Sequence, residues 1–121
     1  MAVILIVEDE VFIREIADLM IQDLGHETLS ASDVDEAMLL LRSSNKIDAL
    51  FTDIYLKEKV LGGCELACKA VKLRPGIRVL YTTGNQLTEK TRSSFVIGAQ
   101  CLHKPYTQHQ LQDSVEHLLA A

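Results

Sequence analysis

The stretch MAVILIVEDEV, residues 1–11, is the segment from which the architecture can first be inferred. Its apolar run, residues 3–7, is short and rich in β-branched side chains, which predicts a strand buried on both faces of a parallel sheet. Three acids, Glu8, Asp9 and Glu10, follow the run directly. Carboxylates that lie together repel one another and raise each other's pKa values, so a positively charged partner is expected at the end of this strand.

Strand-like and helix-like segments alternate along the chain. Apolar or β-branched runs predict strands at residues 3–8, 26–31, 48–53, 77–83 and 100–103. Several of the segments that follow them carry apolar residues at helical spacing. The fourth is polar and predicts a helix over about residues 87–97, with Gly98 as its C-cap. Five strand–helix repeats predict parallel strands, right-handed crossovers and an α/β three-layer sandwich. We expect one domain over residues 1–121, with no output domain.

Composition excludes several classes of protein. The chain has 121 residues, of which 48% are hydrophobic and 24% charged, as in an ordinary globular domain. A net charge of −5 and the lack of a Lys/Arg run argue against a nucleic-acid partner. The apolar run at residues 1–7 is too short to cross a membrane and has no basic segment before it, so we expect neither a membrane protein nor a signal peptide but a cytoplasmic protein.

The cysteines do not predict a metal site. Cys64 and Cys68 stand at i, i+4, but no further Cys or His follows at ligand spacing. In a cytoplasmic protein cysteines are kept reduced. We therefore expect these two residues and Cys101 to be free thiols.

Polar and charged side chains collect where the predicted strands end. The carboxyl ends of parallel strands meet at one edge of the sheet, where open α/β sheets bind their ligands. A single acid after a strand is commonly a helix cap or a solvated turn, and Glu10 fits that interpretation. Groups converging from four strands are harder to explain in this way. They are Glu8 and Asp9 from the first strand, Asp53 from the third, Thr83 from the fourth and Lys104 from the fifth.

This set of groups suits phosphoryl transfer. Mg²⁺ prefers oxygen ligands and commonly binds one or two carboxylates together with phosphate, and such a cation would neutralise the acids. An Asp carboxylate can attack phosphorus as a nucleophile. Lys104 would balance charge on the transferred group. The sequence therefore predicts a cation site that prepares one carboxylate to receive phosphate.

The chain resembles the receiver domain of two-component response regulators through four segments in the family's order and spacing: VILIVEDE, ALFTD, VLYTTG and CLHKPY, at residues 3–10, 49–53, 79–84 and 101–106. The resemblance implies a flavodoxin-like (βα)5 fold with strand order 2-1-3-4-5. It implies a signalling phosphoacceptor rather than an enzyme, although one that promotes its own phosphorylation and slow autodephosphorylation. The phosphoryl group would come from the phosphohistidine of a sensor histidine kinase or a histidine phosphotransfer protein, in a two-component or phosphorelay pathway.

The resemblance assigns the acids to metal binding and phosphorylation. Asp53 would be the phosphoacceptor and would also bind the metal. Asp9 would bind Mg²⁺ directly, Glu8 would bind it through water, and Tyr55 would contribute its backbone carbonyl.

The resemblance also assigns residues that respond to the phosphoryl group. Thr83 would hydrogen-bond a phosphoryl oxygen, and Lys104 would pair with it. Lys104–Pro105 resembles the family's cis peptide bond, which agrees with the rule that cis bonds are mostly X-Pro. Tyr55 and Asn85 occupy the positions at which the family tunes hydrolysis of the acyl phosphate.

Three departures from the family concern the output of the signal. Lys57 stands where the family usually has Pro, the loop at residues 57–63 is longer than usual, and Cys101 stands where the family has its switch aromatic. The resemblance implies a downstream protein partner on the face of the fourth helix, fifth strand and fifth helix. The sequence leaves open a homodimer, and also whether the chain works alone or is part of a hybrid histidine kinase.

Three other kinds of protein fit less well. A haloacid-dehalogenase-type phosphohydrolase needs a second Asp two residues after its nucleophile, where this chain has Tyr55 after Asp53 and Val11 after Asp9. A receiver that only binds partners is expected to lose the acceptor, the acid pair or the lysine, and all are retained. A dinucleotide-binding module needs a glycine-rich turn after the first strand, where this chain has acids.

Overall fold

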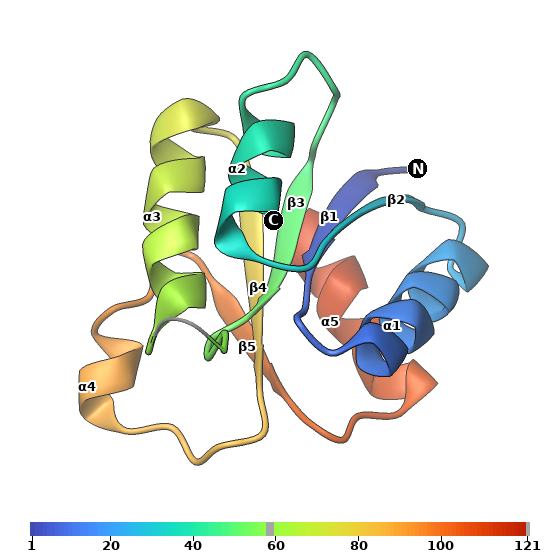
Figure 1. The fold of residues 1–121 in the computed structure, drawn as a ribbon. Helices are drawn as coiled ribbons and strands as arrows, with labels where there is room; N and C mark the ends of the chain where they lie inside the picture. Colours follow the sequence, from blue (N-terminus) through green and yellow to red (C-terminus); the bar gives the residue numbers. More distant parts are fainter. Residues whose placement is uncertain (58–59, 121) are drawn as a thin grey trace.

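The strands and helices alternate in the computed structural model, which describes residues 1–57 and 60–120 (Figure 1). The strands are β1 (Val3–Val7), β2 (Glu27–Ala31), β3 (Ala49–Asp53), β4 (Arg78–Thr83) and β5 (Gln100–His103). The helices are α1 (Val11–Asp23), α2 (Val34–Leu41), α3 (Gly62–Leu73), α4 (Glu89–Arg92) and α5 (Gln108–Ala120).

All strand pairs in the described sheet are parallel, and the order is β2-β1-β3-β4-β5. Figure 1 shows α2 and α3 on one side of this sheet and α1 and α5 on the other. Each strand is followed by a helix that carries the chain back to the end of the sheet where that strand began. The next strand therefore runs in the same direction, and the pairing is parallel. The predicted flavodoxin-like three-layer sandwich is thus confirmed.

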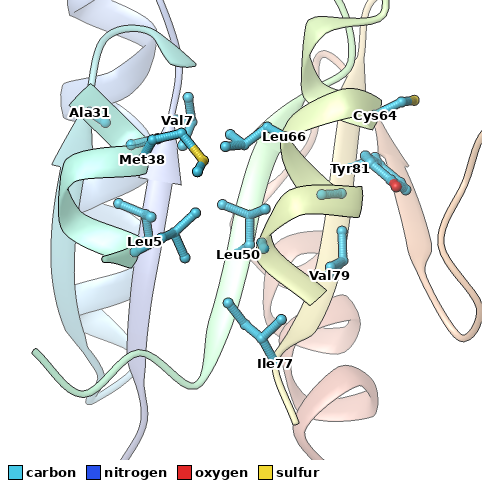
Figure 2. Close-up of a cluster of buried hydrophobic side chains, with 14 of the residues drawn as sticks. Leu5, Val7, Ala31, Met38, Leu50, Cys64, Leu66, Ile77, Val79 and Tyr81 are labelled. Carbon is cyan, nitrogen blue, oxygen red and sulfur yellow. The ribbon is translucent and has the colours of Figure 1, made fainter. Parts of the chain in front are cut away.

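The period of two along each strand divides the core into two clusters. Leu5 and Val7 of β1 pack with α2 and α3, as Figure 2 shows, whereas Ile4 and Ile6 pack with α1 and α5. The central strand β3 is buried at every position. Leu50 is fully buried, so its truncation to Ala is expected to cost about 2–5 kcal/mol of unfolding free energy.

Helix α4 is much shorter than the sequence predicted. A helix was expected over about residues 87–97, but α4 covers only Glu89–Arg92. The hydroxyl of Ser93 donates to the carbonyl oxygen of Lys90 at 2.6 Å, and the N–H of Phe95 donates to the carbonyl of Arg92 at 3.1 Å. Serine side chains that compete for backbone groups favour turns over helix interiors, so the chain continues as turns up to β5. We call residues 93–99 the α4–β5 connector.

Three other expectations from the sequence concern a loop, a helix cap and membrane spans. The long loop expected at residues 57–63 includes residues 58–59, which lie outside the described part of the chain. Glu10 lies at the N-cap position of α1, but its side chain makes no capping hydrogen bond. Within residues 1–57 and 60–120, no helix combines the length and the apolar character needed to span a membrane.

Candidate phosphoacceptor site

Three acids meet at the carboxyl edge of the sheet. Glu8 follows β1, Asp9 comes next, and Asp53 ends β3, which is the neighbour of β1. One carboxylate oxygen from each lies within 4.8 Å of the others. Within the described residues, no other set of three or more His, Cys, Asp or Glu side chains comes this close together. Glu8 and Asp53 are only 4% and 8% exposed, so little water screens their charges.

Lys104 joins the two buried acids. Its Nζ donates to Oε1 of Glu8 at 2.6 Å and to Oδ2 of Asp53 at 2.9 Å. Burial raises the pKa of both carboxyls, and the Lys104 ammonium opposes the rise. Burial by itself lowers the pKa of Lys104, but the hydrogen bonds that its ammonium donates to Glu8 and Asp53 outweigh burial and raise that pKa. Three carboxylates and one ammonium leave a surplus of negative charge, which a divalent cation can neutralise.

Strand β5 brings Lys104 to the site. The backbone N–H of Lys104 donates to the carbonyl oxygen of Thr83 at 2.9 Å, which continues the β4–β5 pairing beyond the last strand residue. The peptide bond between Lys104 and Pro105 is cis, the geometry that the resemblance implies. Thr83 is fully buried at the end of β4, and its Oγ1 accepts a hydrogen bond from the N–H of Asn85 at 3.0 Å.

Asp9 is held by the loop that follows β3. The backbone N–H of Lys57 donates to Oδ2 of Asp9 at 2.7 Å, and the N–H of Glu10 donates to Oε2 of Glu8 at 3.1 Å. Arg14 fixes the backbone between them by donating from Nη1 to the carbonyl oxygen of Glu8 at 2.8 Å. The sequence did not predict these contacts, because each has a backbone group as donor or acceptor, and backbone groups leave no trace in residue type.

A cleft of about 340 Å³ opens over the acids. Tyr55 and Asn85, the two residues expected to tune dephosphorylation, line it together with Gly84. The hydroxyl of Tyr55 lies 3.4 Å from Oγ1 of Thr91 in α4, so this side chain extends from the cleft toward that helix. Both residues are therefore placed beside Asp53, where a phosphoryl group attached to that carboxylate would lie.

Cys101 is not part of this cleft. It lies on β5 opposite Tyr81 of β4, within the core cluster that contains α2 and α3. Burial raises the pKa of its thiol, which keeps the thiol protonated. Cys101 therefore does not line the cleft of the acids and Lys104, but on the neighbouring strand it lies only two register positions from Thr83.

Gly63 is a site residue that the sequence interpretation missed. A Cβ atom at this position would lie 1.9 Å from the carbonyl oxygen of Asp53, a distance that no side chain tolerates. Its N–H also donates to the carbonyl of Ile54 at 3.0 Å. The available signal is the pair Gly62–Gly63, which was expected within the loop but which forms the start of α3.

Comparison with known proteins gives the same family from sequence and from structure. The sequence profile of the response regulator receiver domain matches residues 4–116. An uncharacterised transcriptional regulatory protein of Bacillus subtilis, YbdJ, is 24% identical over 116 residues, which are 96% of this chain and 50% of that protein. The chain therefore spans about half the length of this curated relative.

Solved structures of receiver proteins superpose closely on this fold. A response regulator receiver protein from Sinorhizobium medicae has a TM-score of 0.89 at 28% identity, with 99% of this chain and 95% of that chain covered. NtrX from Brucella abortus has a TM-score of 0.87 at 32% identity, with 98% and 27% covered. The matched profile, the strand order and the acidic pocket at the carboxyl edge of the sheet show that this chain belongs to the response regulator receiver domains of two-component signalling.

Proposed function

We propose that Asp53 accepts a phosphoryl group from phosphohistidine with the help of Mg²⁺. The observation that carries the proposal is the pair of hydrogen bonds by which Lys104 joins Glu8 to Asp53 inside the acid cluster. An oxygen of the Asp53 carboxylate forms the new bond to phosphorus. The bond from phosphorus to the donor nitrogen breaks, and the imidazole keeps the electron pair of that bond. The product is an acyl phosphate on Asp53.

The donor set fits Mg²⁺. Oxygens from Glu8, Asp9 and Asp53 lie within 4.8 Å of one another, and hard divalent cations take carboxylate oxygens. We assign Asp9 and Asp53 as direct ligands, Glu8 as a ligand through water, and the Tyr55 backbone carbonyl as a further ligand. When bound, Mg²⁺ would neutralise charge on the transferred group.

The protein's own groups perform the remaining steps. Lys104 opposes the rise that burial causes in the pKa of Asp53, and its ammonium can then pair with a phosphoryl oxygen. The hydroxyl of Thr83 accepts from Asn85 and can donate its own proton to a second phosphoryl oxygen. Tyr55 and Asn85 border the path by which water reaches phosphorus, and they set the rate of slow autodephosphorylation.

An apolar groove beside the site suits the phosphodonor. Ile13, Met20, Pro105 and Tyr106 line a groove of about 370 Å³ together with Ile16, and Lys104 lies at its end. Next to it, Phe12 and Leu19 of α1 are 79% and 67% exposed. A sensor histidine kinase or histidine phosphotransfer protein that covers these side chains would bring its phosphohistidine to Asp53.

Output passes through protein contacts on the face of α4, β5 and α5. The α4–β5 connector lies on this face, and its Ile97 is fully exposed. An exposed isoleucine on a short loop is a suitable anchor for a downstream protein.

The test is phosphorylation by acetyl phosphate, a donor that needs no docking surface. Wild-type protein with Mg²⁺ should gain one phosphoryl group that is stable in acid and labile in base, as measured by intact-mass spectrometry. Addition of EDTA should abolish the gain, and Asp53→Asn should also abolish it. Asp113→Asn, which changes an exposed acid on α5, is the matched control and should phosphorylate normally. Phosphorylation of Asp53→Asn at the wild-type level would refute the assignment.

A further inference from the structure

Tyr81 places a large aromatic ring on β4 opposite Cys101, the residue of β5 that stands where the family has its switch aromatic. Tyr81 is fully buried on β4, two residues before Thr83, so both side chains lie on the same face of the sheet. Its partner in the register of the next strand is Cys101. Figure 2 shows Tyr81 beside β4 near Cys64, at the edge of the cluster under α3. The buried aromatic ring on the face of Thr83 is therefore on β4, whereas β5 places Cys101 opposite Tyr81 and an exposed His103 opposite Thr83.

Tyr81 reaches out of the sheet to the α4–β5 connector. Its ring stacks on Phe95, with ring centroids 4.3 Å apart and planes inclined by 28°. Its hydroxyl accepts a hydrogen bond from the backbone N–H of Val96 at 3.2 Å. Burial raises the pKa of Tyr81 to about 12, so this contact does not change with pH in the physiological range.

The rest of the connector is held by short-range turns. Phe95 and Ala99 donate only to carbonyls three residues back, those of Arg92 and Val96. Contacts of that kind preserve the local shape of a turn but do not fix it to the sheet. Among the contacts described for Val96, the Tyr81 hydroxyl supplies the polar link to a strand. Ile97 follows directly and is fully exposed.

We propose that Tyr81 couples the phosphoacceptor site to the α4–β5 connector, and this proposal rests on the proposed function of Asp53. Thr83 is drawn toward the phosphoryl group when its hydroxyl donates to it. Tyr81 lies on the same strand and face, so the same displacement shifts its ring and hydroxyl. The hydrogen bond to Val96 and the stack on Phe95 are then broken or remade, which changes how Ile97 is presented to a partner protein.

The contact itself can be tested without phosphorylation. Tyr81→Phe removes the hydroxyl and keeps the ring, and amide hydrogen exchange read by NMR reports directly on the Val96 N–H. Exchange at Val96 should accelerate by roughly tenfold, the ratio that the loss of one hydrogen bond produces. Tyr55→Phe, which removes the hydroxyl near Thr91, and Cys101→Ala are the controls, and both should leave Val96 exchange unchanged. Equal Val96 exchange in Tyr81→Phe and wild type would overturn the proposal.

The coupling is tested with beryllium fluoride and Mg²⁺, which mimic the phosphoryl group on Asp53. In wild type and Cys101→Ala, loading should change the chemical shift and exchange of Val96 and Ile97. In Tyr81→Phe, fluorine NMR should show that Asp53 is loaded equally, while the response of the connector falls by at least about half. Phe95→Leu, which removes the stack and keeps the hydroxyl, should also reduce the response, and this variant decides the matter if Tyr81→Phe does not fold.

The two proposals fail in different ways. A normal connector response in loaded Tyr81→Phe and Phe95→Leu overturns the coupling but leaves Asp53 as phosphoacceptor. Failure of wild type to take up beryllium fluoride and to be phosphorylated at Asp53 overturns the proposed function and, with it, the coupling.

Discussion

A Cβ atom on Gly63 would lie 1.9 Å from the carbonyl oxygen of Asp53, so the first turn of α3 rests directly on the backbone of the proposed phosphoacceptor. The N–H of Gly63 also donates to the carbonyl of Ile54, the residue after Asp53, and this hydrogen bond holds the start of α3 against the end of β3. The position of the Asp53 carboxylate therefore depends on the start of a helix that contributes no side chain to the cleft.

Gly63→Ala should displace the end of β3. Because the added methyl group meets backbone and not a flexible side chain, we expect a loss of about 1–3 kcal/mol of unfolding free energy, together with slower phosphorylation by acetyl phosphate. Gly76→Ala is the matched control, since a Cβ there meets nothing within 4 Å. Urea unfolding and the rate of acyl-phosphate formation are the measurements. Equal effects of the two substitutions would contradict the prediction.

Lys104→Ala should separate metal binding from signalling. Removing the ammonium takes away a cation that competes for Glu8 and Asp53, so Mg²⁺ affinity measured by calorimetry should stay the same or rise. The response to phosphorylation should weaken, because no ammonium then pairs with the phosphoryl oxygen that Lys104 would bind. Lys46→Ala, which breaks an exposed ion pair with Asp48, should change neither. A normal response of Lys104→Ala to phosphate would remove the role assigned to this lysine.

Asp53→Asn should stabilise the protein in a way that depends on pH. Burial raises the pKa of Asp53, with Lys104 opposing, so the folded state keeps this proton to higher pH than the unfolded chain does. Wild-type stability therefore falls as the pH rises from the ordinary aspartate value, about 4, through the raised pKa. In EDTA, the melting temperature of Asp53→Asn should exceed that of wild type most at pH 7.5 and least near pH 4. A larger gain in melting temperature at pH 4 than at pH 7.5 would show that the pKa of Asp53 is lowered by folding, and would contradict the prediction.

Tyr55→Asn should shorten the lifetime of the acyl phosphate. The ring of Tyr55 borders the cleft and its hydroxyl reaches toward Thr91. In the role proposed for it, this ring would cover a phosphoryl group on Asp53 from water. An amide in its place can orient the attacking water, and a correctly oriented nucleophile accelerates hydrolysis on the order of tenfold. Decay of labelled protein is the measurement, with Tyr55→Phe as a control that keeps the ring. Equal decay of wild type and Tyr55→Asn would refute the prediction.

Replacing Phe12 and Ile16 by Ser should slow transfer from a protein donor and leave transfer from acetyl phosphate unchanged. Both side chains are exposed on α1, and Ile16 lines the groove that Lys104 also lines. Loss of one buried apolar anchor commonly weakens a complex by about tenfold. Leu39→Ser changes an equally exposed leucine on α2 and should have no effect. A matching loss with acetyl phosphate would point to the chemistry and not to docking.

The sequence was sufficient for the sheet and for the acid cluster, because both follow from local patterns. Buried parallel strands favour apolar runs, and four of the five strands end at or beside the group that they deliver, as β3 does at Asp53. The length of α4 was not predictable in this way. The polar segment before Gly98 suggested a longer helix, but α4 ends at Arg92, and Phe95 and Val96 pack against the core beyond its end.

Contacts between distant segments were also beyond the sequence. The sequence showed that Cys101 replaces the family's aromatic residue on β5. Nothing in the residue pattern showed that the Tyr81 hydroxyl accepts a hydrogen bond from the N–H of Val96. The same holds for Gly63, whose importance comes from a carbonyl that lies opposite it in space. Such contacts depend on where loops settle, and loop positions are set by the packing of the whole domain.

The sheet separates the two apolar surfaces that the proposals use. The groove along α1 belongs to the side of the sheet with α1 and α5, whereas Tyr81 and Phe95 belong to the side with α2 and α3. A donor seated in the groove therefore does not cover the α4–β5 connector. Under the two proposals, a donor bound at α1 and a target bound at Ile97 use different sides of the sheet, so one molecule could be phosphorylated again by its donor while a target stays bound at the connector.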